Sequence, residues 1–362
     1  MPGKINVGIL FGGKSVEHEI SVRSATNVAA NIDKAKYNVE LVGIDKKGGW
    51  YHCASVNQEI TKGDPVSLRL SSKGHFFYNL SRDEEILLDV IFPVLHGTDG
   101  EDGSIQGMLT TSGIPCVGSG VQGSANSMDK YISKRLLKEA GVPVSKFLYA
   151  NFRQRDSLNF QDIATAVGVP FIIKPACLGS SVGVSKISNE SEFTKAVQNT
   201  FTYDNEVIFE EFIEGRELEC GIIGNSQPIA TNPGEVVVSG DYAFYTYEAK
   251  YLDPNAAQII IPAKVPDQIK NSIKYWSVAA YQALNCADYA RVDLFLKADG
   301  TILINEINTI PGFTDSSMFP MLWNDAGISY TALITKLIEM SLARTKEKQR
   351  LETNFAAREY QS

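Results

Sequence analysis

The order of apolar and polar positions predicts an α/β chain that begins with a parallel sheet. An apolar run over 6–11 predicts a buried strand, the spacing over about 21–32 predicts a helix, and a second apolar run over 39–44 predicts the next strand. A strand, a helix and a strand within about 40 residues form a βαβ unit, whose strands pair in parallel. The apolar run 88–93 predicts a further buried strand in this segment.

Further along, a helix is expected from near Asp129, because Gly141 and Pro143 provide a stop after an apolar stripe. A strand over 171–174 leads into a glycine-rich loop, and a closing helix is expected over about 330–344, followed by a charged end that should fray. The stripe of the first of these helices is expected to consist of Ile132, Leu136, Leu137 and Ala140.

Two short segments interrupt the pattern and serve as candidate boundaries. The Gly/Ser-rich run 118–124 predicts a flexible hinge, and Glu214 with Gly215 predicts a second hinge. The expected division is an N-terminal domain over 1–124, a central domain over 125–213, a C-terminal domain over 214–345 and a charged tail over 346–362.

Composition narrows the class of protein. The 362 residues include 34 Lys and Arg against 42 Asp and Glu, and this net charge of −8 argues against nucleic acid or an anionic membrane as a partner. No apolar run approaches the roughly 18–20 residues of a membrane span, and no signal-peptide core follows the N-terminus. The five cysteines form no C-x-x-C pair, and the four histidines have no metal-ligand spacing. We expect a soluble, cytoplasmic, multidomain enzyme.

Two nucleotide-binding motifs match the sequence literally and are rejected. The segment Gly8–Ser15 fits the phosphate-loop pattern G-x-x-x-x-G-K-[ST], but apolar residues place Gly8 inside the strand, and Glu17 follows where a phosphate would bind. The run Gly118–Gly123 fits G-x-G-x-x-G, but it lies far from the first βα turn and lacks the acidic residue that should follow. A phosphate-loop kinase using Lys14 and Ser15 stays as a competing hypothesis.

The strongest signal is a hairpin flanked by acidic residues. Asp299-Gly300 between two apolar runs favours a two-residue type I′ turn. With that turn, Asp293 faces Glu306 across the ladder, Arg291 faces Asn308, and all four side chains project from one face. The opposite face is expected to be core and to consist of Val292, Leu294, Leu296, Leu303 and Ile307.

Two carboxylates about 5 Å apart across a ladder repel each other unless a cation lies between them. Arg291 could be that cation. The alternative is Mg²⁺, which takes oxygen ligands, usually from one or two carboxylates plus substrate phosphates. Asp293, Glu306 and the amide oxygen of Asn308 are suitable ligands, and Arg291 would then stabilise negative charge that develops in a transition state.

A phosphate held by this metal would need cationic and glycine-rich partners elsewhere in the chain. Lys174 ends a strand just before the loop Gly179–Gly183, whose backbone N–H groups could close over phosphates, and Lys130 lies beside the start of its helix. Each lysine alone is ordinarily a solvated charge, and a glycine-serine loop alone is ordinarily a turn. Together with the hairpin they predict an ATP site that is not a phosphate loop.

The sequence resembles the D-alanine–D-alanine ligases of the ATP-grasp superfamily, over about residues 5–340. The resemblance rests on several motifs that follow one another along the chain, and not on a single motif. They are Gly12–Ser21, His96-Gly97 with Gly100–Gly103, Ser127–Lys130, Lys174-Pro175 through Gly183, Tyr245–Tyr251 and Asn305–Gly312.

The resemblance implies an α/β fold in which a Rossmann-like parallel-sheet domain precedes a two-subdomain ATP-grasp fold. It implies that the carboxylate of one D-alanine attacks the γ-phosphate of ATP, and that the amine of a second D-alanine then attacks the acyl phosphate. The product would serve peptidoglycan precursor synthesis. Two Mg²⁺ ions, with Mn²⁺ as a substitute, a monovalent cation as an accessory and a homodimer are further expectations of the family.

By position, the resemblance also assigns roles to single residues. The metal ligands would be Asp293, Glu306 and Asn308. The ATP contacts would be Lys130, Lys174, Ser180, Ser181, Glu210, Glu211, Ile213, Glu217 and Lys250, with Glu211 acting through its backbone. The first D-alanine would contact Glu17 and His96, and the second Ser317 and Met318. The catalytic set would be Glu17, Ser180, Tyr251, Arg291 and Gly312, with Tyr251 and Ser180 linked to Glu17 in a loop that closes over the site.

Each of these side chains also has an ordinary structural explanation. Glu17 could cap the first helix, His96 could bond a loop carbonyl, and Tyr251 could be a half-buried strand aromatic. A protein that kept this fold but only binds amino acids is a further alternative, and the intact pair of carboxylates argues against it.

Overall fold

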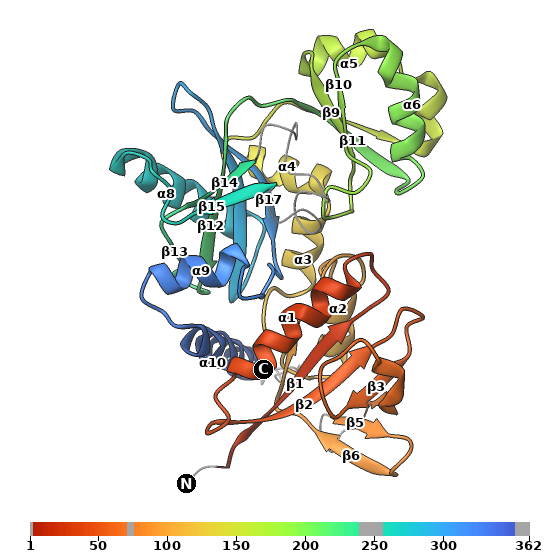
Figure 1. Ribbon diagram of the computed structural model, residues 1–362, viewed down its shortest axis with the longest axis vertical. Coiled ribbons are helices and arrows are strands. Elements are labelled where there is room, and N and C mark those ends of the chain that lie inside the picture. Colours follow the sequence, from red (N-terminus) through yellow and green to blue (C-terminus); the bar gives the residue numbers. More distant parts are fainter. Residues whose placement is uncertain (1–2, 71–75, 239–255, 352–362) are drawn as a thin grey trace, which may run out of the picture.

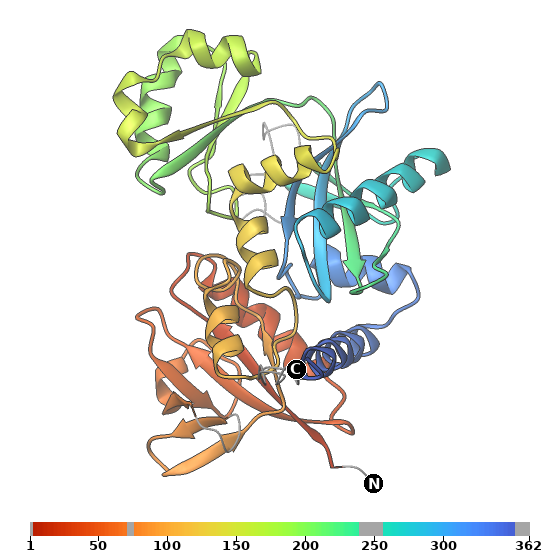
Figure 2. The same cartoon turned by 180° about the vertical axis from the view of Figure 1, so that it is seen from behind.

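The computed structural model describes residues 3–70, 76–238 and 256–351, and this part of the chain contains three β-sheets. The N-terminal sheet lies at one end of the molecule, the sheet of residues 147–211 at the other end, and the C-terminal sheet between them (Figures 1 and 2). Helices α3 (Val121–Met128) and α4 (Lys130–Glu139) connect the first sheet to the other two.

The N-terminal sheet has the strand order β6-β5-β4-β3-β2-β1-β7. The predicted parallel unit is confirmed, because Val7 pairs in parallel with both Val39 and Val90. The strands between 50 and 87 extend the sheet in antiparallel fashion, which the sequence analysis did not predict. The elements are β1 (Ile5–Gly12), α1 (His18–Asn31), β2 (Tyr37–Ile44), β3 (Trp50–Cys53), η1 (Ile60–Lys62), β4 (Asp64–Arg69), β5 (Phe76–Asn79), β6 (Glu84–Leu87), β7 (Val90–Pro93) and α2 (Ser104–Thr111).

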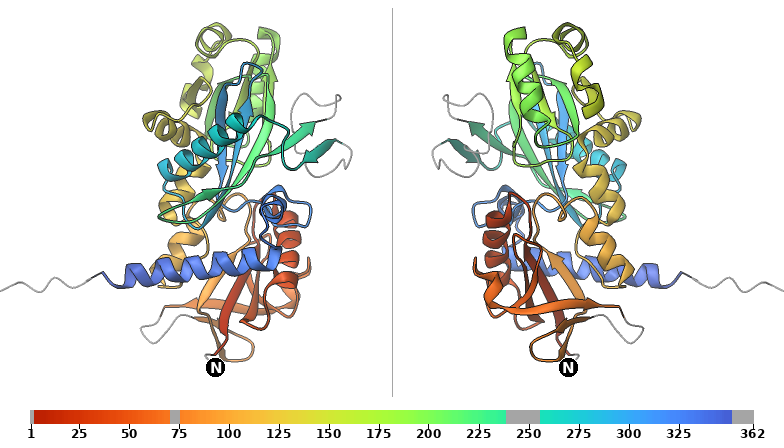
Figure 3. Two further views of the ribbon diagram at one scale, coloured as in Figure 1. Left: turned by 90° about the vertical axis from the view of Figure 1, so that its left-hand side faces the viewer. Right: turned by 90° about the vertical axis from the view of Figure 1, so that its right-hand side faces the viewer.

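The last helix of the described chain completes the core of this first sheet. Helix α10 (Tyr330–Gln349) contacts α1 and crosses it at a large angle (Figure 3), and its Leu333 and Leu337 are fully buried in one cluster with Val7 and Phe11. The helix ends five residues beyond the expected Arg344 and so extends into the segment predicted as a charged tail. Apolar burial therefore ties the two ends of the described chain together.

The Gly/Ser-rich segment after residue 117 is not the flexible hinge that its composition predicts, because helix α3 begins at Val121. Gly123 lies against backbone: a Cβ at this position would be 2.4 Å from the carbonyl oxygen of Asn285. Small residues here permit close packing against the C-terminal region, and they do not mark a loose linker.

The central sheet has the order β10-β9-β11-β8, and all its pairs are antiparallel. Its core is aromatic, with Phe171, Phe193 and Phe209 in mutual edge-to-face or stacked contact. The elements are β8 (Phe147–Asn151), η2 (Phe152–Ser157), α5 (Phe160–Val167), β9 (Phe171–Pro175), β10 (Ser185–Ile187), α6 (Glu190–Thr200) and β11 (Glu206–Glu211).

The C-terminal sheet has the order β15-β14-β12-β16-β17, and β13 pairs with β12. Helix α8 covers one face of this sheet (Figure 1) and contributes the buried Ile273, Ala280 and Tyr281 to its core. The elements are β12 (Arg216–Ile223), β13 (Ile229–Ala230), β14 (Gly234–Val238), β15 (Ala257–Ile260), α8 (Asp267–Ala283), β16 (Tyr289–Leu296), β17 (Ile302–Asn308) and α9 (Met318–Asp325).

The predicted pairing in the β16–β17 hairpin is confirmed, but the predicted turn is wrong. Asp293 pairs with Glu306 and Arg291 pairs with Asn308, whereas Leu296 pairs with Ile302, one residue out of the expected register. The backbone bond from Lys297 N to Thr301 O closes a three-residue turn in which only Gly300 has a left-handed φ of 85°. A β-bulge at Asn305 then shifts the register by one residue in the opposite direction. Asp293 therefore still pairs with Glu306, as the two-residue turn predicted.

The bulge also changes which residues of β17 are core. Ile302, Ile304 and Ile307 are buried, whereas Leu303, which was expected in the core, is only partly buried. The extra residue, Asn305, lines the large cavity described below.

Arg344 of α10 should be a strong contributor to stability. Its guanidinium contacts both oxygens of Asp288, which is fully buried, and also donates to the carbonyl oxygens of Cys116 and Gly118. Arg344→Met should lower the free energy of unfolding by about 3 kcal/mol, because it leaves a buried carboxylate without its cation. Urea denaturation measures this change. Lys346→Met, at an exposed position of the same helix, should change it by less than about 0.5 kcal/mol, and equal losses in both variants would contradict the assignment.

Candidate active site

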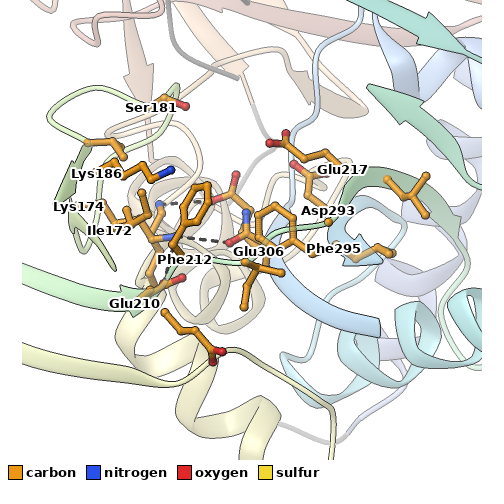
Figure 4. A pocket seen from close by; sticks show the side chains of 18 of the residues that line it. Ile172, Lys174, Ser181, Lys186, Glu210, Phe212, Glu217, Asp293, Phe295 and Glu306 are labelled. Atoms are coloured by element: carbon orange, nitrogen blue, oxygen red, sulfur yellow. Dashed lines mark hydrogen bonds and ion pairs between the residues drawn. The ribbon is translucent and has the colours of Figure 1, made fainter. Parts of the chain in front are cut away.

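A cavity of about 440 Å³ lies between the central sheet and the C-terminal sheet. Figure 4 shows its two walls: Lys174, Lys186 and Glu210 on one side, and Asp293 and Glu306 on the other. Its lining is apolar at one end, where Ile172, Phe212 and Phe295 point into it.

The two predicted lysines form the polar floor of this cavity and are not solvated charges. Lys174 is 8% exposed; its Nζ lies 3.1 Å from Glu210 Oε1 and donates to Asn305 Oδ1 at 3.4 Å. Lys130 is 9% exposed; its Nζ donates to the Leu178 carbonyl at 2.8 Å and lies 3.6 Å from Glu306 Oε2. Both ammonium groups are thus held by protein oxygens at the place where phosphates were expected.

The glycine-rich loop is strained at two serines. Ser180 and Ser181 both have positive φ, 54° and 57°, a conformation that L-residues seldom adopt and that clusters at functional sites. The Ser180 hydroxyl donates to Glu17 Oε1, which ties the loop to the start of α1. Glu17 occupies the N-cap position of α1, but its side chain makes no cap bond, so capping does not explain the carboxylate.

The family resemblance implies that Glu210, Glu211, Ile213 and Glu217 would line an adenine and ribose pocket, and these residues come from β11, the segment that follows it and β12. Glu211 N donates to the Lys146 carbonyl at 3.0 Å, and its carboxylate accepts from Lys146 N at 3.4 Å. Its side chain is thus directed to the backbone of Lys146, and the contact of its own backbone with a base stays a prediction. Lys186, which the sequence analysis missed, lies 3.6 Å over the ring of Phe212. Ile213 and Glu217 complete the lining of this end.

Glu210 lines the cavity and is 4% exposed. Burial alone would raise its pKa, but Lys134 and Lys174 outweigh that effect and hold the pKa of the carboxyl below its usual value. Lys134, which was not part of the predicted stripe, has a side chain that is 1% exposed, with Nζ 3.4 Å from Glu210 Oε2. The predicted apolar stripe of α4 is therefore only partly correct: Leu137 is buried, Ala140 is exposed, and Lys130, Ser133 and Lys134 occupy the buried face.

The pair of carboxylates on the hairpin has a third acidic neighbour. Arg291 donates to both oxygens of Asp293 at 2.7 Å and lies 2.9 Å from Glu219, a residue of β12 that the sequence analysis missed. Asn308 also donates to Asp293, at 3.0 Å. In the alternative explanation, Arg291 is the cation that separates Asp293 from Glu306. It does pair with Asp293, and also with Glu219, while Glu306 contacts Lys130.

These donors fit Mg²⁺ bound together with a nucleotide. Asp293 and Glu306 supply carboxylate oxygens from adjacent strands, and Asn308 supplies an amide next to them. Among the described residues, no group of three or more His, Cys, Asp or Glu side chains is arranged to hold an ion alone. Two carboxylates completed by phosphate oxygens are the usual protein environment of Mg²⁺.

A smaller cavity, of about 180 Å³, adjoins the first and shares Gly179, Ser180, Glu219 and Glu306 with it. Glu17 and His96, both from the N-terminal part of the chain, line it together, and their contact with the first D-alanine stays a prediction. The Nδ1 atom of His96 donates to the Ile310 carbonyl at 2.9 Å, and its Nε2 accepts from the Ser24 hydroxyl at 3.0 Å. His96 thus bonds a loop carbonyl as the alternative explanation supposed, and burial lowers its pKa and keeps the ring neutral.

Glu101 also lines this smaller cavity, although in the sequence it stands out only as part of the Gly100–Gly103 motif. Its carboxylate accepts from Gly97 N at 2.7 Å and from Ile310 N at 3.3 Å. Desolvation and the negative charge of Glu17 nevertheless raise the pKa of Glu101 to about 8. No spacing signal could have revealed it, because its neighbours come from segments distant in the sequence.

The far wall of the smaller cavity contains the residues expected to take the second substrate. Gly312, Ser317 and Met318 all line it, together with Arg291. Ser317 Oγ accepts from Thr314 N at 3.0 Å, and a Cβ on residue 312 would lie 2.8 Å from this hydroxyl. Glycine is therefore required at 312 for Ser317 to hold its place. Lys250 and Tyr251 lie outside the described residues, and their roles stay predictions.

The fold and the two cavities together define the class of protein: an ATP-grasp fold, with a nucleotide-sized cavity between two antiparallel sheets and a second polar cavity joined to it at the carboxylates. Comparison with known proteins then identifies the family. The model of the D-ala D-ala ligase N-terminus matches residues 6–119, and that of the D-ala D-ala ligase C-terminus matches residues 136–339. The chain belongs to the D-alanine–D-alanine ligase family.

Relatives cover nearly the whole chain. It is 46% identical to the D-alanine–D-alanine ligase of Oceanobacillus iheyensis, over 97% of this chain and 99% of that protein, and 43% identical to D-alanine–D-alanine ligase A of Escherichia coli K12, over 97% and 100%. Among solved structures it resembles the Coxiella burnetii D-alanine–D-alanine ligase (TM-score 0.86, 33% identity, 96% of each chain) and the VanG D-Ala:D-Ser ligase of Enterococcus faecalis (TM-score 0.85, 33% identity, 94% and 100%).

Within the ranges that the structure describes, no helix is both long enough and apolar enough to cross a bilayer.

The raised pKa of Glu101 should make stability depend on pH. Between about 4.5 and 8 the folded protein holds a proton that the unfolded chain has lost, so this group makes the free energy of unfolding fall as the pH rises through that window. Glu101→Gln should remove this contribution, which urea denaturation at several pH values would measure as a flatter profile than that of the wild type. Glu85→Gln, at an exposed position, should leave the profile unchanged. Identical profiles for Glu101→Gln and the wild type would contradict the assignment.

Proposed function

We propose that this chain is an ATP-dependent ligase that joins two D-alanines into D-alanyl-D-alanine for peptidoglycan precursor synthesis, releasing ADP and phosphate. The observation that supports this best is the pair of adjoining cavities that share Ser180, Glu219 and Glu306. A nucleotide in the larger cavity can point its terminal phosphate at a small amino acid in the other. Family membership agrees with this assignment.

The first step requires the first D-alanine to be held with its carboxylate toward the γ-phosphate. Glu17 would pair with its ammonium group, and Lys130 and Lys174 would contact the phosphates. A carboxylate oxygen attacks the γ-phosphorus, the bond between the β-phosphate oxygen and the γ-phosphorus breaks, and ADP leaves. We propose that Asp293, Glu306 and Asn308 hold two Mg²⁺ ions, or Mn²⁺ in their place, which supply charge neutralisation on the phosphates.

The second step forms the peptide bond. The amine of the second D-alanine attacks the acyl carbonyl, an oxyanion develops, and inorganic phosphate departs as the amine loses its proton. Arg291 and the backbone N–H of Gly312 line the smaller cavity and would stabilise the oxyanion. Ser317 would accept the carboxylate of the second D-alanine, and Met318 would border its methyl group.

Arg291 contacts Asp293 and Glu219 at once, which supports this role. A guanidinium fixed by two carboxylates does not have to reorganise when negative charge appears beside it, and such preorganisation is the largest contribution in many enzymes. The acyl phosphate would hydrolyse if water entered, so the site must exclude water during both steps.

D-Alanine is the proposed second substrate as well as the first. The curated relatives at 43–46% identity are D-alanine–D-alanine ligases, which supports D-alanine at both positions. We also propose that the protein works as a homodimer in the cytoplasm, where ATP is available, and that a monovalent cation is an accessory.

The test is phosphate release in the presence of ATP and Mg²⁺. The protein should release phosphate with D-alanine and form D-alanyl-D-alanine, and mass spectrometry would show whether D-serine or D-lactate enters the product in competition. Release with L-alanine and none with D-alanine would overturn the proposal.

Two substitutions distinguish this site from the rejected phosphate loop. Glu306→Gln should lower kcat/KM by more than about 100-fold, because it removes a metal-ligand charge at the junction of the cavities. Lys14→Ala should have little effect, because Lys14 forms an exposed ion pair with Asp99 at 2.9 Å, away from both cavities. A kinase that used Lys14 would show the reverse order.

A further inference from the structure

Lys134 is a buried lysine that the proposed mechanism does not use. It lies on α4 one turn after Lys130, its side chain is 1% exposed, and it does not line either cavity. An ammonium group in the interior is strongly unfavourable unless it is paired, and an apolar side chain of similar size would serve packing alone equally well. Its charge therefore calls for an explanation beyond packing.

The contacts of Lys134 lead to the nucleotide cavity in two steps. Its Nζ donates to Ser145 Oγ at 3.0 Å and lies 3.4 Å from Glu210 Oε2, which also accepts from the Ser145 hydroxyl at 3.4 Å. The other carboxylate oxygen, Oε1, lies 3.1 Å from Lys174 Nζ. Glu210 thus contacts two ammonium groups. One of them belongs to Lys174, which lines the nucleotide cavity (Figure 4).

The charges of these three side chains set the potential at the cavity floor. Lys134, Glu210 and Lys174 together carry one net positive charge. Without Lys134, Glu210 and Lys174 would form a neutral pair, and the carboxylate would be free to associate more closely with Lys174. A buried charge a few ångströms away is weakly screened, so a nearby polyphosphate would bind less tightly.

We propose that Lys134 is a positioning residue for nucleotide binding: by sharing Glu210 it keeps Lys174 directed into the cavity with a surplus positive charge for the phosphates of ATP. The inference rests on the proposed function, because it requires a nucleotide triphosphate at Lys174. It adds a residue that touches neither substrate and acts through Glu210.

Isothermal titration of the full chain with Mg-ATP, in the absence of D-alanine, tests this inference. Lys134→Met keeps the length of the side chain and removes its charge, and it should weaken ATP binding about tenfold. The double variant Lys134→Met/Glu210→Gln restores one net positive charge, and it should bind ATP within about threefold of the wild type. A merely structural role predicts no such rescue by a second change in the interior.

A matched control on the same helix separates a loss of the buried charge from a general effect of a Lys→Met change. Lys138→Met, at an exposed position on the same helix, should bind ATP like the wild type, and the KM for D-alanine should change less than about twofold in Lys134→Met and Lys138→Met. If the wild type does not bind ATP, the proposed function itself fails. If the wild type binds and Lys134→Met binds equally well, or if the double variant is as weak as Lys134→Met, the inference alone is overturned.

If Lys134→Met does not fold, the double variant and Glu210→Gln decide the question. Glu210→Gln retains both lysines, so it should bind Mg-ATP about tenfold more tightly than the double variant. Equal affinities in these two variants would overturn the inference.

Discussion

The site depends on the antiparallel pairing of β16 with β17, which sets Asp293 opposite Glu306. Strand geometry then fixes the sides of the sheet: Arg291 and Asn308 project with the acids, while Val292 and Ile307 are buried in the C-terminal core. The core side chains cannot exchange faces without exposing apolar surface, so the polar side chains cannot leave the wall that both cavities share. Packing on one face of the hairpin thus determines chemistry on the other.

Around this hairpin the protein balances charges over short distances. Asp293 and Glu219 share Arg291, Glu306 contacts Lys130, and Glu210 lies between two lysines. Each of these groups is at least partly withdrawn from water, where an unpaired charge is costly. A bound nucleotide brings phosphate charge that competes for the lysines, and a divalent ion competes for the carboxylates. The same contacts that balance these charges therefore determine how strongly each ligand is held.

Some predictions were confirmed because local rules were sufficient. The prediction of the acidic pair was confirmed because two errors in the register cancelled. The rejection of the phosphate loop required only the apolar run that places Gly8 inside β1, where it pairs with Glu40. The acidic pair was predicted from a two-residue turn that does not form. The three-residue turn shifted the register by one, and the bulge at Asn305 shifted it back. Turn length can be read only approximately from an Asp-Gly pair, and a bulge inside an apolar strand leaves no reliable signal.

By itself the sequence determined the strands that carry the ligands, the lysines and glycines that surround a nucleotide, and the motifs of the family, because these depend on residue types at short spacings. Only the tertiary structure decided which charges are buried and what they contact. Lys134, Glu219 and Glu101 resemble ordinary surface residues in the sequence, and the buried face of α4 is the one with the lysines. The closure of the N-terminal core by α10 also appears only in three dimensions. Such contacts join segments far apart in the chain, and burial depends on what the rest of the fold places against a side chain.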